Sequence, residues 1–138
     1  MHSRSTRRTI GVLLALLLSA AVSVSAQFGH PLKGQWSGQW GPATAPKRLL
    51  LDLQWDGKAI TGSINPGEEK AVVKNVTFDY ADPTKWKVTI EADGKDAAGK
   101  PVKIVANGTL ENLGAYYKVF HGTWTEGAQK GDFTVTRN

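Results

Sequence analysis

Glycine recurs on the apolar side of segments in which apolar and polar residues alternate, and this pattern most restricts the possible fold. Residues two apart in a strand share a face, so Gly34, Trp36, Gly38 and Trp40 point to one side of residues 33–41. Four later segments repeat the arrangement around Gly62, Gly108, Gly122 and Gly131. Glycine in a strand marks bends or close backbone approach. An inner face that combines glycines with large side chains is typical of a small, strongly curved barrel.

The alternation continues through most of the chain after residue 33, and turn residues such as Asp56-Gly57 and Pro66-Gly67 interrupt it. It predicts strands over residues 34–40, 47–56, 59–65, 71–80, 85–92, 101–111, 115–125 and 130–137. Asn107-Gly108 would allow a hairpin inside 101–111, but the apolar residues on both sides keep one parity, which favours a single strand. We therefore expect an all-β fold, an eight-stranded antiparallel up-and-down barrel without free edges. Two packed four-stranded sheets also fit the alternation but explain the inward glycines less well.

The first 26 residues have the layout of a secretory signal peptide. Arg4, Arg7 and Arg8 precede an apolar run over residues 10–24, and Val24-Ser25-Ala26 supplies small residues for cleavage. The run is shorter than the roughly 20 residues that span a bilayer. We expect residues 27–138 to form one domain that is periplasmic or extracellular and is not inserted in a membrane. The twin arginine leaves two export routes open.

Charge and cysteine content narrow the function classes. The net charge of +5 falls to +2 without the three leader arginines, and so small an excess predicts no nucleic-acid partner. The chain has no cysteine, so neither a disulfide nor a lipid-modified cysteine can contribute. Stability must come from buried apolar area and closed hydrogen bonding.

Short motifs resemble those of the calycins, the superfamily of lipocalins and avidins. Gly34-Gln35-Trp36 resembles the calycin G-x-W motif, and Arg137 matches the arginine that packs across that tryptophan. The hairpin at Asp56-Gly57 and Thr61-Gly62 resembles one in avidins. The resemblance implies a calycin-like barrel with Gly34, Trp36 and Arg137 in structural roles. Gly38 and Pro42 stand where avidins carry biotin-binding side chains, so biotin binding is not implied. The last strand also resembles that of small secreted bacterial barrels.

A meander brings alternate connections to the same end of a barrel. One end should carry the connections 56–58, 81–84 and 112–114, and parity places an aromatic plug there, made of Trp36, Trp55, Tyr80, Trp86 and Tyr116 with Arg137. The other end should carry the longer connections 41–46, 65–70 and 93–100 and would form any mouth. There parity predicts a ligand-binding set of Trp40, Lys74, Trp124 and Phe133, with Lys74 pairing an anionic group. The alternative for Lys74 is a side chain that reaches solvent from the rim.

The sequence contains no motif typical of a catalytic or metal-binding site. His30 and His121 are the histidines after the leader, and we expect both to be solvated. No metal, cofactor or enzymatic activity is expected. Two hypotheses remain. The chain is a secreted non-catalytic protein whose barrel holds a small apolar or aromatic ligand, or it is a cell-envelope module or inhibitor that binds a protein partner with a filled barrel.

Overall fold

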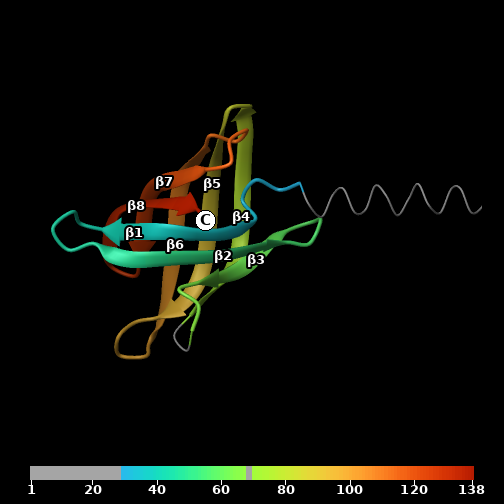
Figure 1. Ribbon diagram of the computed structural model, residues 1–138. Coiled ribbons are helices and arrows are strands. Elements are labelled where there is room, and N and C mark those ends of the chain that lie inside the picture. The colour runs from blue at the N-terminus through green and yellow to red at the C-terminus, as the bar shows by residue number, and fades with distance from the viewer. Residues whose placement is uncertain (1–28, 68–69) are drawn as a thin grey trace, which may run out of the picture.

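The computed structural model describes residues 29–67 and 70–138, which form eight antiparallel strands (Figure 1). The predicted leader lies outside the described residues, so its cleavage stays a prediction. The strands are β1 (Gly34–Gly41), β2 (Lys47–Trp55), β3 (Ile60–Ile64), β4 (Ala71–Asp82), β5 (Lys85–Lys95), β6 (Pro101–Glu111), β7 (Val119–Glu126) and β8 (Gln129–Arg137). β6 continues through Asn107-Gly108, which confirms the single strand expected there.

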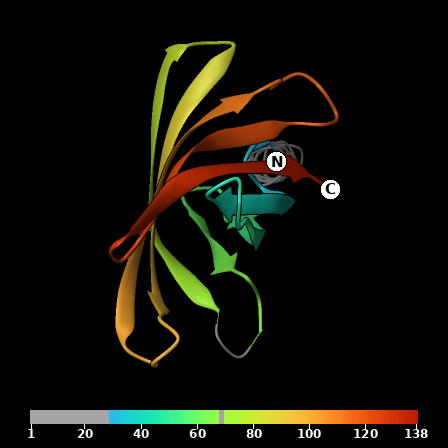
Figure 2. The same ribbon diagram turned by 90° about the vertical axis from the view of Figure 1, so that its left-hand side faces the viewer.

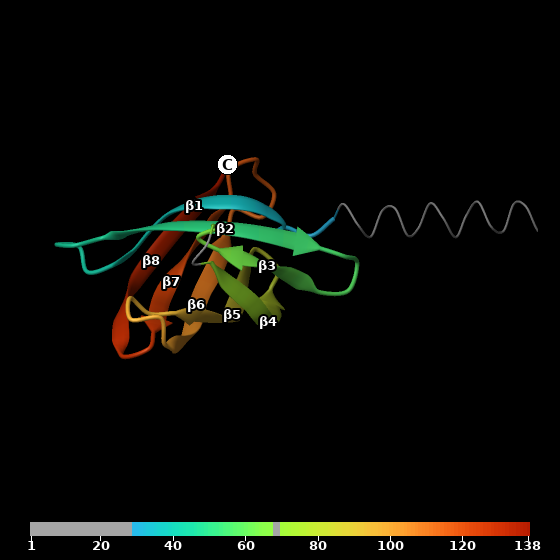
Figure 3. The ribbon, with the colours of Figure 1, turned by 90° about the horizontal axis from the view of Figure 1, so that it is seen from below.

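The strands close into a barrel in chain order, because each strand pairs with the next and β8 pairs back onto β1. Trp36 lies opposite Arg137 and Trp40 opposite Phe133 in the closing pair. The strands coil strongly, so that β1–β3 cross the direction of β4–β6 (Figures 1 and 2). The β1–β2 hairpin extends beyond the rest of the barrel (Figure 3). The expected fold class is confirmed, and the open sandwich is excluded by the β1–β8 pairing.

Five aromatic rings in mutual contact run through the barrel core. Trp36 meets Phe120 at 6.4 Å between ring centroids, Phe120 meets Phe133 at 4.9 Å, Phe133 meets Trp124 at 5.7 Å, and Trp124 meets Trp40 at 5.8 Å. All five side chains are buried. We call this set the aromatic column. Aliphatic residues such as Leu49, Leu53 and Ile90 pack around it, so burial of large apolar side chains supplies the stability that a chain without disulfides needs.

The inward glycines allow neighbouring strands to approach closely. A Cβ at Gly38 would overlap the Thr134 carbonyl group, and one at Gly122 would overlap that of Asn107. At Gly108 a Cβ would lie only 2.8 Å from the Phe133 ring. The glycines thus make room both for the coiled backbone and for the aromatic column, as the alternating pattern predicts.

Strand β4 departs from the predicted parity. Val73 pairs with Ala92 and Val76 with Ile90, and the register shifts between Val73 and Asn75. This β-bulge adds one residue, Lys74, to β4. Residues after the bulge keep the predicted inward phase, but Val73 rather than Val72 is buried before it. The prediction that Lys74 points inward is therefore wrong, because alternation reverses across a bulge.

The connection between β6 and β7 is longer than predicted. Strand β7 begins at Val119 rather than at residue 115, and residues 112–118 form turns. Tyr116 is consequently 79% exposed instead of filling the barrel.

In the described part of the chain, no helix has the length and hydrophobicity needed to span a lipid bilayer.

Candidate functional site

The two ends of the barrel differ in how they are closed. The proximal end is where β1 begins and β8 ends, and it carries the connections 56–59, 83–84 and 112–118. The distal end carries the connections 42–46, 65–70, 96–100 and 127–128. The grouping of connections agrees with the predicted meander.

At the distal end, the predicted ligand residues Trp40, Trp124 and Phe133 lie together but are buried within the aromatic column. The Lys47 ammonium lies 4.9 Å from the Trp40 ring centroid. Lys74 is exposed at the β4 bulge and does not share their inward face. The ligand-binding role of these four residues stays a prediction.

One polar group in the column lacks a partner. The Trp124 indole nitrogen is buried and makes no hydrogen bond to any described group. A hollow of about 200 Å³ beside the β1–β2 hairpin touches Trp40 and Phe133. Buried N–H groups are nearly always paired, commonly with ordered water. The Trp124 indole is therefore the feature of the column that favours binding of a polar group there, from a water molecule or a ligand.

The proximal end is sealed by the turn that precedes β1. Leu32 is fully buried, and its carbonyl oxygen accepts a hydrogen bond of 2.9 Å from Trp36 Nε1. The backbone N–H of Lys33 donates to the carbonyl of His30 and closes the turn. Leu32 thus occupies the position that a plug of five aromatics was predicted to fill.

Aromatic side chains displaced from that position form a second cluster, which remains partly open. The His30 ring contacts Trp55 at 4.6 Å, Phe78 at 4.9 Å and Trp86 at 5.9 Å. Tyr80 stacks on Phe78 at 5.5 Å and meets Trp86 edge-on at 4.6 Å. We call His30, Trp55, Phe78, Tyr80 and Trp86 the aromatic end. Tyr80 is 53% exposed, and the other four side chains are half-buried.

His30 is not the solvated side chain that the sequence predicts. Besides its three ring contacts, Nδ1 accepts a hydrogen bond of 3.1 Å from the backbone N–H of Leu32. Burial lowers the pKa of His30 below its usual value. The sequence signal for this arrangement is weak: an apolar residue, Leu32, stands four positions before Trp36. His121, by contrast, lies on the outer surface as expected, with Nε2 3.5 Å from Glu111.

Replacing His30 with asparagine should flatten the pH dependence of stability. The unfolded chain takes up a proton at the ordinary histidine pKa, whereas the folded form resists it, so stability is full above about pH 6.5 and falls as the pH is lowered. Asparagine keeps an acceptor for Leu32 but does not titrate. Urea unfolding at pH 7.5 and 5.5 should show the smaller loss for His30→Asn; equal losses would contradict the assignment.

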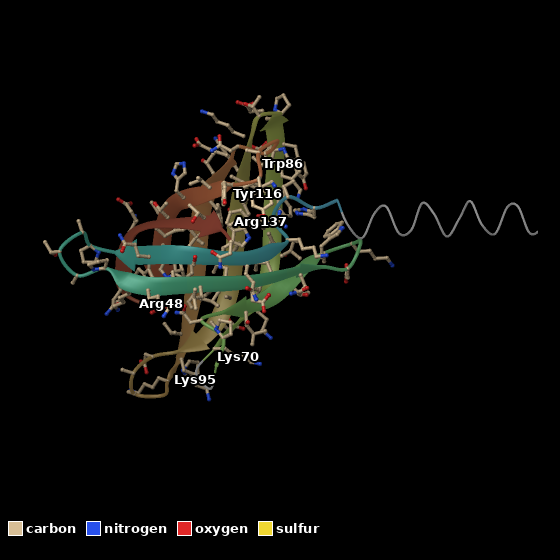
Figure 4. All side chains as sticks on the ribbon, in the orientation of Figure 1. Arg48, Lys70, Trp86, Lys95, Tyr116 and Arg137 are labelled. Carbon is tan, nitrogen blue, oxygen red and sulfur yellow. The ribbon has the colours of Figure 1, made fainter. Side chains whose placement is uncertain are left out.

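A basic hollow of about 300 Å³ adjoins the aromatic end and shares His30 with it. Lys33, Lys118 and Arg137 contribute its cationic side chains. Figure 4 shows Arg137 on the same side of the barrel as Trp86 and Tyr116, whereas Arg48, Lys70 and Lys95 lie toward the distal end. Burial and the nearby Arg137 both lower the pKa of Lys118.

Among the described residues, no group of three His, Asp or Glu side chains is arranged to hold a metal ion.

No protein-family model, curated protein or solved structure matches the chain. The fold class therefore rests on the strand pairing itself: an all-β, closed, eight-stranded antiparallel barrel.

Proposed function

We propose that the chain is an exported, non-catalytic binding protein with a calycin-like barrel, and that it holds a small apolar or aromatic ligand at the aromatic end. The observation that carries the proposal is the partial exposure of five mutually contacting rings beside a filled core. Ring stacking adds to area burial when an aromatic ligand binds. An aromatic wall with a few placed polar groups is also the usual form of a small-molecule site.

The five tryptophans allow a direct test by NMR. Trp55 and Trp86 belong to the aromatic end, whereas Trp36, Trp40 and Trp124 belong to the aromatic column. Titration with 2-naphthamide, a neutral flat probe, should shift the indole N–H signals of Trp55 and Trp86 and leave the other three in place. Trp→Phe variants assign the signals.

The outcome also separates the two possible locations of a ligand. Shifts confined to Trp40 and Trp124 would move the site to the column and give the unpaired Trp124 indole its partner. Replacing Trp86 with leucine should weaken the probe, and the matched change Trp124→Phe should not. The absence of any shift at millimolar probe would contradict the proposal.

A protein partner in the cell envelope is the second candidate. It is favoured by Tyr116 and Tyr117, which lie 79% and 68% exposed on the connection beside the aromatic end. Exposed tyrosines are enriched in protein interfaces. Replacing both with serine should abolish capture of an envelope protein while leaving the naphthamide shifts unchanged, if this candidate applies.

The proposed export predicts that the signal peptide is removed. Cleavage after Ala26 should leave a mature chain that begins at Gln27 and is found outside the cytoplasm. The intact mass of protein recovered from its secreting host measures the start directly. A mature form that retains Arg7 and Arg8 would rule out this cleavage.

A further inference from the structure

The basic hollow holds two cations side by side. The backbone N–H of Arg137 donates to the Lys118 carbonyl at 3.1 Å, which fixes the end of β8 beside the start of β7. The Arg137 guanidinium lies against Gly34, where a Cβ would come within 2.9 Å of Nε. The missing side chain at Gly34 thus makes room for the guanidinium, which lines the same hollow as Lys118.

Lys118 and Arg137 form no ion pair with a carboxylate of the described residues. Across residues 29–67 and 70–138, the ion pairs found join Lys85 and His121 to Glu111, and neither Lys118 nor Arg137 belongs to one. The Lys118 ammonium donates instead to the Ala115 carbonyl at 3.3 Å. Burial, and after it the like charge of Arg137, lower the pKa of Lys118, because like charges held together disfavour each other's charged form. An anion placed between them would relieve that repulsion.

The hollow and the aromatic end meet at one residue. His30 lines the hollow and also contacts Trp55, Phe78 and Trp86. A ligand whose ring stacks beside His30 can therefore extend a substituent into the hollow. Arginine recognises a planar carboxylate through two parallel hydrogen bonds.

We propose that Lys118 and Arg137, with Lys33 at the rim, form a subsite for the carboxylate of an aromatic or apolar acid whose ring lies on the aromatic end. The inference rests on the proposed function, because it assigns the second half of the same ligand.

Three probes that share a naphthalene ring test the subsite: 2-naphthoate, 2-naphthamide and 2-naphthyl phosphate. By isothermal titration calorimetry, 2-naphthoate should bind about tenfold more tightly than neutral 2-naphthamide, since two partly exposed ion pairs each contribute a factor of about three to five. The preference should shrink at high salt. A preference for 2-naphthyl phosphate over the carboxylate would overturn the carboxylate assignment.

Variants locate the effect. Lys118→Gln and Arg137→Gln should each reduce the naphthoate preference from about tenfold to about threefold without changing naphthamide affinity, and Lys118→Arg should retain it. The matched changes Arg48→Gln and Lys95→Gln, at exposed cations near the distal end (Figure 4), should have no effect. Because Arg137 also pairs with β1, thermal unfolding checks each fold, and Lys118→Gln decides if Arg137→Gln is unstable.

The possible failures are distinguishable. Equal affinity for naphthoate and naphthamide in the unmodified chain, or equal weakening of both probes by Lys118→Gln, would overturn the subsite and leave the aromatic site standing. Absence of binding by all three probes would overturn the proposed function and the subsite with it.

Discussion

Replacing Trp36 with alanine is expected to lower the free energy of unfolding by about 3–5 kcal/mol, the usual loss for a buried tryptophan. Its side chain is fully buried, meets Phe120 edge-on, and donates to the Leu32 carbonyl. Alanine would leave a cavity in the column and a buried carbonyl without its donor. It would also loosen the turn that seals the proximal end. Equilibrium denaturation in urea measures the loss.

Trp86→Ala is the matched control, because that ring is half-buried at the aromatic end. It should cost clearly less stability than Trp36→Ala while removing one ring of the proposed ligand site. A loss below about 1 kcal/mol at Trp36, the average for any substitution, would mean that the indole is not part of the core.

Replacing Gly122 with alanine should be almost as damaging, although it adds only one methyl group. The new Cβ would overlap the Asn107 carbonyl and come within 2.6 Å of Gly108 Cα on β6. Because both obstacles are backbone atoms of the neighbouring strand, a change of rotamer cannot relieve them. We expect a loss of about 3 kcal/mol, at the upper end of the usual cost of overpacking, measured by the same urea titration.

Gly114→Ala provides the control for this change. A Cβ at Gly114 meets no atom within 4 Å, so the substitution should leave stability within about 0.5 kcal/mol of the original. Similar values for Gly114→Ala and Gly122→Ala would show that the glycines of the inner face are not needed for close strand approach.

Much of the fold follows from the sequence because alternation is a local property that survives in most strands. Trp36, Trp40, Phe120 and Phe133 all face inward as their parity predicts. Closure follows from the inward glycines, which an open sandwich does not need. The start of β7 was misplaced because residues 115–118 continue an apolar pattern, whereas the chain forms a turn there, with Ala115 N–H bonded to the Asn112 carbonyl.

The candidate site was less predictable, because it depends on which side chains compete for the same space. Parity and the meander correctly bring Trp55, Tyr80 and Trp86 to one end. Nothing in the alternation indicates that Leu32, which precedes the first strand, seals the barrel and leaves these rings partly open. The position of Lys74 was wrong for another reason: a bulge leaves no mark in the pattern of apolar residues.

The bulge makes Lys74 the extra residue of β4, so pairing with β5 constrains neither its side chain nor its presence. Val73 before it and Val76 after it both face inward, although they are three positions apart in the sequence. A scan of substitutions would score the exposed Lys74 as dispensable. Deleting the same residue would remove the bulge and make the pairs Val73–Ala92, Asn75–Glu91 and Val76–Ile90 consecutive, so both halves of β4 would keep their apolar side inward. Lys74 should therefore tolerate deletion as well as substitution, whereas a deletion in the regular part of β4, where every residue has a partner on β5, would turn one half of the strand's apolar side outward.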